Sequence, residues 1–281
     1  MLELSPHLQQ HLPKENTFDR LLDWPGNVHR HIKHRRTVEA EIGGRRYFIK
    51  AHRGCGWREV WKDWLSFRPP IVSARTEWEA IERAQRLGIA TVTVAGKGER
   101  GRAPAQVESF LITEALDGMI HLEDLTRDWG GLTGRRQKLL KRALLERIAR
   151  IARALHEGGM NHRDFYLGHF LVKDRRWADW LPGDPLEVFL IDLHRVQSWK
   201  RLPLRWRVKD LGALLYAAID IGLTKRDLLR FVEIYRGQPW RESLNADARL
   251  WRRVWRNTAR LLSVYQDGRK LPAWAAHARP H

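Results

Sequence analysis

The chain has 281 residues, 43% of them hydrophobic and 30% charged, which indicates a folded protein with a sizeable core and excludes a disordered chain. Its 51 lysine and arginine residues exceed its 33 acidic residues, and the resulting formal charge of +18 favours a polyanionic partner. The single cysteine, Cys55, excludes an internal disulfide and a cysteine-based metal cluster, and fits a reducing compartment.

Targeting and membrane-spanning signals are missing from the sequence. Residues 1–16 lack the basic start and uninterrupted apolar stretch of a secretory signal. The longest apolar segment, Leu211 to Leu223, is interrupted by Asp220 and is too short to span a bilayer. We therefore expect a cytoplasmic protein, with contact to a membrane limited to its surface.

The N-terminal part is predicted to be rich in strands. Residues 1–24 have the pattern of an irregular or partly helical segment. An alternating run, the Gly43-Gly44 pair and a second apolar run over residues 28–50 predict a β-hairpin. Helical spacing over residues 74–87 predicts a helix that Gly88 ends.

Two further strands are predicted at residues 90–95 and 109–113. The segment between them, residues 96–105, is rich in glycine and charge, which is typical of a turn.

The C-terminal part is predicted to be helical. Leucine and isoleucine recur at intervals of four and three over residues 135–156, which predicts a long helix that Gly158-Gly159 ends. A short apolar run over residues 188–191 follows, and helices are predicted from about Lys209, with one at residues 248–265. The order predicts an α+β fold with two lobes, a small β-rich lobe over residues 1–115 and a larger helical lobe over residues 116–281.

Two aspartates occur where phosphoryl transfer would need them. This chemistry requires a cation on the triphosphate, oxygen ligands for a metal and a carboxylate that orients the nucleophile. Asp164 follows the long helix and precedes the apolar residues 170–172, and Asp192 ends a predicted buried strand. A carboxylate at a buried strand end is costly unless it meets a cation, so both aspartates are candidates for one site.

These residues lie in motifs that resemble those of protein kinases. Residues 162–164, His-Arg-Asp, followed by Phe-Leu-Val at 170–172, resemble the catalytic loop, with His169 in the usual place of asparagine. Residues 191–194 resemble the metal-binding motif. The strand at residues 47–50 resembles the one that carries the phosphate-binding lysine.

A closer resemblance is to the bacterial lipopolysaccharide core heptose kinases, and it extends from about residue 26 to residue 236. These kinases share the histidine at the position of His169. The segments that carry the resemblance are residues 52–57, 77–81, 161–172, 191–195 and 209–224. It implies a protein-kinase-like fold and transfer of phosphate from ATP to a heptose of the inner core, the first heptose being expected.

The resemblance also implies roles for residues in the C-terminal lobe. Asp164 would orient the sugar hydroxyl and accept its proton. Asp192 would hold Mg²⁺, with His169 as a second metal-proximal group. Whether His169 binds metal or braces Asp164 by a hydrogen bond stays open, because imidazole is a less natural ligand for Mg²⁺ than oxygen. Asp210 would brace the catalytic loop. His162 is interpreted from its position as a structural residue of the loop rather than as a base.

In the nucleotide-binding lobe, Lys50 would contact the α- and β-phosphates and Glu77 would position it. The backbone from Glu114 to Leu116 would bind adenine. No glycine-rich loop precedes Lys50, and we assign no phosphate ligand within residues 26–33.

Other functions remain to be weighed. The chain could phosphorylate another core sugar, Kdo or heptose II, or could be a non-catalytic protein with a kinase fold. The charge alone would suit a nucleic-acid-binding protein, but no motif for nucleic acid accompanies it, so none is expected. The expected partners are the anionic inner core, the cytoplasmic face of the inner membrane and, from its association with this family, acyl carrier protein. The protein is expected to be a monomer.

Overall fold

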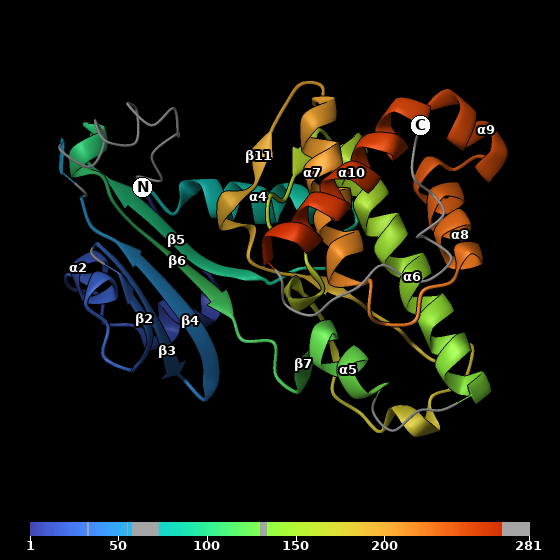
Figure 1. Cartoon of the computed structure of the whole chain (residues 1–281). Helices are drawn as coiled ribbons and strands as arrows, with labels where there is room; N and C mark the ends of the chain where they lie inside the picture. The colour runs from blue at the N-terminus through green and yellow to red at the C-terminus, as the bar shows by residue number, and fades with distance from the viewer. Residues whose placement is uncertain (33, 55, 58–72, 130–133, 266–281) are drawn as a thin grey trace. The chain divides into compact units, whose positions relative to one another are not determined.

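The computed structural model describes residues 1–265 except residues 33, 55, 58–72 and 130–133 (Figure 1). Its internal contacts form two compact units. The first unit contains residues 1–83 and 92–117, and the second contains residues 84–91 and the chain from residue 118 onward. The predicted α+β class is confirmed, because the N-terminal region forms an antiparallel sheet and the C-terminal part is mostly helical. The boundary after residue 115 stays a prediction, because a compact unit need not be an independent domain.

The first unit contains a six-stranded antiparallel sheet, in the order β1-β5-β6-β4-β3-β2. The predicted hairpin is confirmed as β3 (Arg35–Ile42) and β4 (Arg45–His52). Gly43 and Gly44 form its turn with φ of 57° and 76°, a conformation that side-chain-bearing residues rarely adopt. The other strands are β1 (Leu2–Leu4), β2 (Asn27–Ile32), β5 (Val94–Arg100) and β6 (Glu108–Glu114).

Strand β5 corrects the prediction of a strand at residues 90–95 followed by a turn. The strand begins at Val94 and continues through the glycine-rich segment to Arg100, paired with β6. A Cβ on Gly98 would lie 2.5 Å from the ring of Phe110, and one on Gly96 would lie 2.8 Å from Leu4. These glycines therefore allow close packing inside a strand, and their turn-like composition misled the prediction.

The N-terminal segment packs on this sheet. Helices α1 (Pro6–His11) and α2 (Thr17–Leu22) bury Leu8, Leu21 and Leu22 against sheet residues that include Tyr47 and Phe110. This segment was predicted to be irregular or partly helical. The helices are confirmed, and the pairing of β1 with β5 was not predicted.

The second unit is built around α6 (Gly134–Glu157), which confirms the predicted long helix. Helix α6 packs against α8 (Lys225–Arg236), and α7 (Leu204–Ala217) packs against α10 (Ala248–Tyr265), as Figure 1 shows. Helix α7 begins five residues before the predicted start at Lys209. Helices α5 (Leu122–Asp128) and α9 (Trp240–Ala246) also belong to this unit, whereas α4 (Arg75–Arg86) lies mostly in the first unit.

Short strands complete the second unit and carry the loops of the site. Strands β7 (Met119–His121), β9 (Phe170–Lys173) and β10 (Phe189–Leu190) form one small sheet, and β8 (Met160–Asn161) pairs with β11 (Gln197–Ser198). None of the helices in the described residues is long and apolar enough to cross a membrane.

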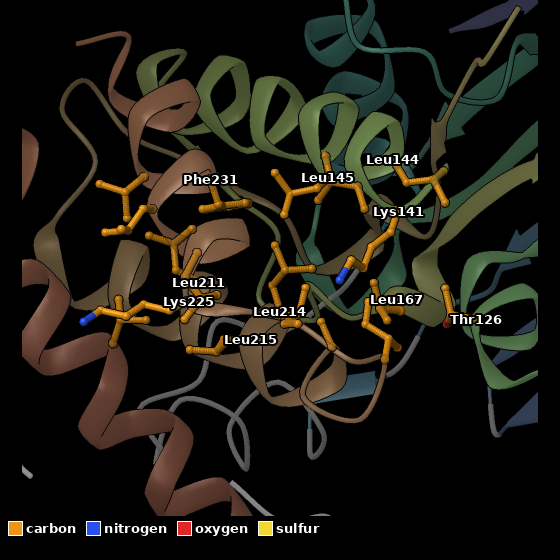
Figure 2. Close-up of a pocket in the computed structure, with 18 of the residues that line it drawn as sticks. Thr126, Lys141, Leu144, Leu145, Leu167, Leu211, Leu214, Leu215, Lys225 and Phe231 are labelled. Carbon is orange, nitrogen blue, oxygen red and sulfur yellow. The ribbon is translucent and has the colours of Figure 1, made fainter. Parts of the chain in front are cut away.

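An apolar cavity of about 270 Å³ lies within the helices of the second unit (Figure 2). Leucine, isoleucine and aromatic side chains from α6, α7, α8 and α10 form most of its wall. The lining also includes Lys141 and Lys225, whose long aliphatic stems suit an apolar wall while the ammonium groups reach a polar environment.

Candidate active site

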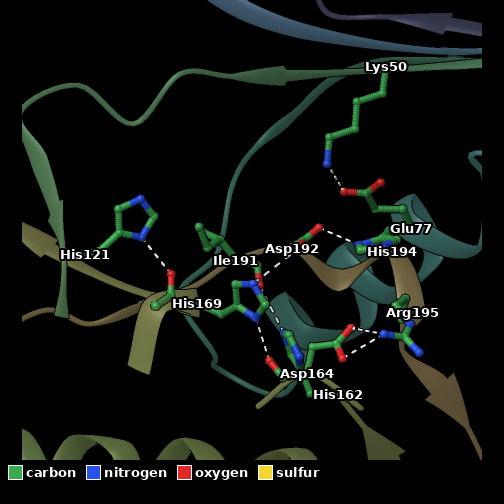
Figure 3. A network of polar contacts seen from close by, with 11 residues as sticks. Lys50, Glu77, His121, His162, Asp164, His169, Ile191, Asp192, His194 and Arg195 are labelled. Carbon is green, nitrogen blue, oxygen red and sulfur yellow. Dashed lines mark hydrogen bonds and ion pairs between the residues drawn. The ribbon is translucent and has the colours of Figure 1, made fainter. Parts of the chain in front are cut away.

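Lys50 and Glu77 form an ion pair in the first unit (Figure 3). Lys50 lies on β4, opposite Leu111 of β6, and Glu77 lies in the first turn of α4. Glu77 is 4% exposed, and a buried carboxylate without a cation would be strongly destabilising. The pair therefore fixes the direction of the lysine side chain while leaving a quarter of its surface open, at 26% exposure.

The predicted adenine-binding segment follows strand β6. The backbone N–H of Glu114 donates to the carbonyl of Thr93 at 3.0 Å, and that of Ala115 donates to the carbonyl of Arg46 at 3.0 Å. These two donors are thus already used within the first unit. A ligand at this segment would have to bind other groups, such as the backbone of Leu116.

Asp164 lies in the second unit, in the loop that follows α6 and β8. Arg195 donates from Nη1 to both oxygens of its carboxylate, each at 2.8 Å. The Asp164 side chain is 17% exposed. Charge-assisted hydrogen bonds of this length hold a carboxylate in one orientation. Asp164 is therefore held in place while part of its surface stays accessible.

Asp210, fully buried on α7, holds the backbone of this loop. Its carboxylate accepts hydrogen bonds from the backbone N–H of His162 at 2.6 Å and of Arg163 at 2.9 Å. Arg163 has φ of 74°, a left-handed conformation that costs about 1–3 kcal/mol for a residue with a side chain. The two bonds from Asp210 offset this strain, and the loop is fixed just before Asp164.

His162 joins the loop to the segment that contains Asp192. Its Nε2 lies 3.0 Å from the carbonyl oxygen of Ile191, so Nε2 must carry a proton and donate it. Burial, the largest effect, lowers the pKa of His162, and the nearby His169 lowers it further, although Asp210 acts in the opposite direction. His162 is therefore neutral at pH 7, and its contacts agree with the structural role predicted for it.

His169 connects the Asp164 loop to Asp192 (Figure 3). It lies at the end of a 3₁₀ turn (Leu167–His169), with Nδ1 2.5 Å from the backbone carbonyl of Asp164 and Nε2 3.6 Å from Asp192 Oδ2. The carbonyl can only accept, so Nδ1 carries the proton. The other nitrogen, Nε2, then faces a carboxylate oxygen of Asp192.

Asp192 itself lies two residues after the end of strand β10, in the left-handed conformation with φ of 63°. Its Oδ1 lies 2.5 Å from Nδ1 of His194, and its side chain is 33% exposed. Strained backbone of this kind is common at functional sites. The geometry leaves the Oδ2 side of the carboxylate facing His169.

The carboxylate of Asp192 fits Mg²⁺, whereas the imidazole of His169 is a less natural ligand for this ion. This ion is held by one or two carboxylates, with phosphate and water oxygens filling the remaining positions. The described residues contain no group of three histidine, cysteine or acidic side chains that could hold a metal. A single partly exposed carboxylate nevertheless suits an ion that arrives with a nucleotide, because phosphate and water oxygens supply the other ligands and a full set of protein ligands is not needed.

The comparisons with known proteins identify the family. Residues 19–235 match the model of the lipopolysaccharide kinase (Kdo/WaaP) family. The chain belongs to this family. Two relatives are named lipopolysaccharide core heptose(I) kinase WaaP. The one from Pseudomonas aeruginosa is 44% identical over 229 residues, covering 80% of this chain and 82% of the relative. The one from Escherichia coli K12 is 38% identical over 254 residues, covering 89% of this chain and 92% of the relative.

A solved structure agrees with the family assignment. The structure titled "WaaP in complex with acyl carrier protein" is 37% identical in sequence and covers 93% of this chain and 99% of its own, with a TM-score of 0.77. The lipopolysaccharide kinase family was predicted from the motifs, and that prediction is confirmed.

Within each unit the structure brings together residues that the motifs singled out. Asp164, His169 and Asp192 share one network in the second unit, and Lys50 contacts Glu77 in the first. Their roles in the reaction stay predictions. Motif reading did not assign the partners of the two aspartates, Arg195 and His194. Both follow Asp192 within the quoted segment 191–195, but nothing in their spacing indicates which carboxylate each would meet.

Proposed function

We propose that the protein is an ATP-dependent kinase that phosphorylates a heptose of the lipopolysaccharide inner core, the first heptose. The observation that carries the proposal is the network in which His169 contacts the backbone of Asp164 and faces the carboxylate of Asp192. A phosphoryl transferase needs such a pair, one carboxylate for the nucleophile and one for the metal. The printed names of the relatives support the choice of acceptor.

In the proposed reaction, Asp164 orients the sugar hydroxyl and accepts its proton. The hydroxyl oxygen forms a bond to the γ-phosphorus, the bond from this phosphorus to the β–γ bridging oxygen breaks, and ADP leaves. Arg195 keeps the Asp164 carboxylate in one orientation through its two hydrogen bonds. Asp210 fixes the backbone on which Asp164 depends.

Nucleotide binding in this proposal is assigned to four positions that the motifs singled out and to the segment after β6. Lys50, held by Glu77, contacts the α- and β-phosphates, and the backbone near Glu114 and Leu116 binds adenine. Asp192 and His169 are the residues that would hold Mg²⁺, which supplies charge neutralisation at the β- and γ-phosphates when it is bound with ATP.

The test is incubation of the purified protein with Mg-ATP and dephosphorylated core lipopolysaccharide, followed by mass and linkage analysis. We expect one added phosphate on the first heptose. Addition to Kdo or to heptose II would correct the acceptor and retain the chemistry.

The Asp164→Asn variant tests the role of the carboxylate, and Asp174→Asn, an exposed position after β9, is its matched control. We expect kcat to fall by about 10²–10⁴-fold in the first variant and to stay within twofold in the second. An Asp164→Asn variant with the wild-type rate would refute the proposed catalytic role.

We further propose peripheral contact with the cytoplasmic face of the inner membrane. The acceptor is anchored in lipid, and Arg249, Arg252, Arg253 and Arg256 of α10 line one surface hollow of about 300 Å³. Clustered arginines on a helix bind anionic headgroups, and salt weakens such binding. Co-sedimentation with phosphatidylglycerol vesicles at low and high salt tests this contact, and equal binding to neutral vesicles would count against it.

Acyl carrier protein is the proposed protein partner, supported by the complex of the solved relative. The apolar cavity of the second unit is suited to the alkyl chain that such a carrier bears. Native mass spectrometry of the protein purified from cells tests the partnership, and it also tests the proposed monomeric state of the kinase chain.

A further inference from the structure

Three cationic side chains surround one tryptophan beside the Asp164 loop. Arg163 lies 5.4 Å from the ring centroid of Trp206, Arg205 lies 5.3 Å from it, and the ammonium of Lys209 lies 5.6 Å from it. Each contact is within the range of a cation–π interaction. We call Trp206, Arg205, Lys209 and Arg163 the Trp206 cluster.

Two members of this cluster, Arg205 and Lys209, are not neutralised by an ion pair within the described residues. Asp164 accepts from Arg195, and Asp210 accepts from the loop backbone. Within the described part of the chain, no carboxylate forms an ion pair with Arg205 or Lys209. Arg205 and Lys209 therefore add positive charge beside the Asp164 loop. Arg205 is exposed and Lys209 is partly buried, and at Lys209 Coulombic repulsion is less screened than at the surface.

The ionisation of Lys209 reflects this repulsion. Burial lowers the pKa of Lys209 most, and the charges of Arg163 and Arg195 lower it further, although Asp164 and Asp210 act in the opposite direction. The same interactions show that Lys209 lies within electrostatic reach of Asp164. An anion bound at Lys209 would thus lie close to the proposed catalytic carboxylate.

The position of the cluster on α7 is also unfavourable in the free protein. Arg205 and Lys209 lie in the first two turns of α7, and its first turn contains no acidic residue. The N-terminal end of a helix carries partial positive charge that acts mainly within the first turn, so the cation of Arg205 is disfavoured there. A bound anion would reverse the sign of this interaction, because helix N-termini favour negative charge.

We propose that Arg205 and Lys209, packed on Trp206, form a subsite for an anionic group of the acceptor, a carboxylate or a phosphate, beside its reactive hydroxyl. This proposal rests on the proposed sugar kinase function. The subsite would select acceptors that already carry negative charge and would hold them next to Asp164. It assigns specificity to residues that take no part in phosphate transfer itself.

The experiment uses the full-length variants Arg205→Gln and Lys209→Gln and the double variant. Arg241→Gln is the matched control, because Arg241 also packs over a tryptophan, Trp240, at 4.3 Å but lies on α9. Two measurements are made on each protein, the dissociation constant for core lipopolysaccharide without nucleotide and the KM for the same acceptor with Mg-ATP. The dissociation constant is compared for native core, dephosphorylated core, and dephosphorylated core with its carboxyl groups converted to neutral methylamides. The KM is compared for the two dephosphorylated forms, because the native core already carries the phosphate that the reaction adds.

We expect each variant to raise the dissociation constant and the KM for the acceptor by about tenfold or more, the size of one charge-assisted hydrogen bond. The KM for ATP should not change, the melting temperature should not fall, and Arg241→Gln should behave as wild type. The wild-type protein should bind the acceptor that lacks the recognised group as weakly as the variants bind the acceptor that carries it. Loss on the methylamide acceptor would identify a carboxylate, and loss on dephosphorylation alone would identify a phosphate.

Wild-type affinity of the double variant for every acceptor would overturn the proposal, as would an equal loss in Arg241→Gln. The binding measurement separates this proposal from the proposed function. Binding that depends on Arg205 and Lys209 without any phosphate transfer would retain the subsite and refute the kinase activity. Phosphate transfer by the double variant with the wild-type KM for the acceptor would retain the kinase activity and refute the subsite.

Discussion

Replacing Asp210 should release the Asp164 loop, and its effect follows from two hydrogen bonds. The carboxylate is fully buried and accepts from the backbone N–H groups of His162 and Arg163, at 2.6 and 2.9 Å. A hydrogen bond to a charged group contributes about 1.5–3 kcal/mol to stability. Asp210→Ala removes both and leaves two buried donors unpaired, so we expect a loss of about 3–6 kcal/mol in the free energy of unfolding.

Asp210→Asn is the more informative variant, because its amide carbonyl can still accept from one of the two donors. We expect a loss of about half that size, which leaves a folded protein if the total stability is in the usual range of about 5–15 kcal/mol. The folded variant should nevertheless have a lower kcat, because Arg163 is then free to leave its left-handed conformation and Asp164 moves with it.

Urea unfolding followed by circular dichroism measures the stability of these variants, and steady-state kinetics on the folded proteins measures kcat. Asp179→Asn, an exposed position in an exposed ion pair, is the control and should change stability by less than about 0.5 kcal/mol. If Asp210→Asn unfolds at the wild-type urea concentration and retains kcat within twofold, the account of the loop is wrong.

Three further predictions concern other parts of the molecule. Gly98→Ala should cost about 1–3 kcal/mol in urea unfolding, because its Cβ would lie 2.5 Å from the ring of Phe110; a wild-type midpoint would contradict the packing described for β5. Thr224→Ala should cost about 1 kcal/mol, because it removes the capping box that Thr224 forms with Asp227 at the start of α8, and Thr224→Ser should restore most of it. Burial lowers the pKa of His162 in the folded protein, so as the pH falls the unfolded chain binds the proton first. The contribution of neutral His162 to the free energy of unfolding should be fully present above about pH 6.5 and should decrease below it, by at most about 1.4 kcal/mol per pH unit. His162→Gln should remove this part of the pH dependence of unfolding.

Features with a local pattern could be read from the sequence. The hairpin over β3 and β4 is encoded by alternation and by two glycines, and α6 is encoded by its apolar spacing and by the glycines after it. Asp164 and Asp192 were found because each lies in a short motif with a fixed relation to its own helix or strand. The physical reason is that such patterns depend on neighbours within a few residues, where the sequence alone specifies the geometry.

Features that depend on distant neighbours required the tertiary structure. Gly96 and Gly98 lie in a strand because Phe110 and Leu4 pack on them, whereas the local composition is that of a turn. The contact of Arg195 with Asp164 joins residues 31 positions apart, and the orientation of His169 is set by a backbone carbonyl and a carboxylate on different segments. Packing and hydrogen bonding between segments decide these contacts, and no spacing within one segment encodes them.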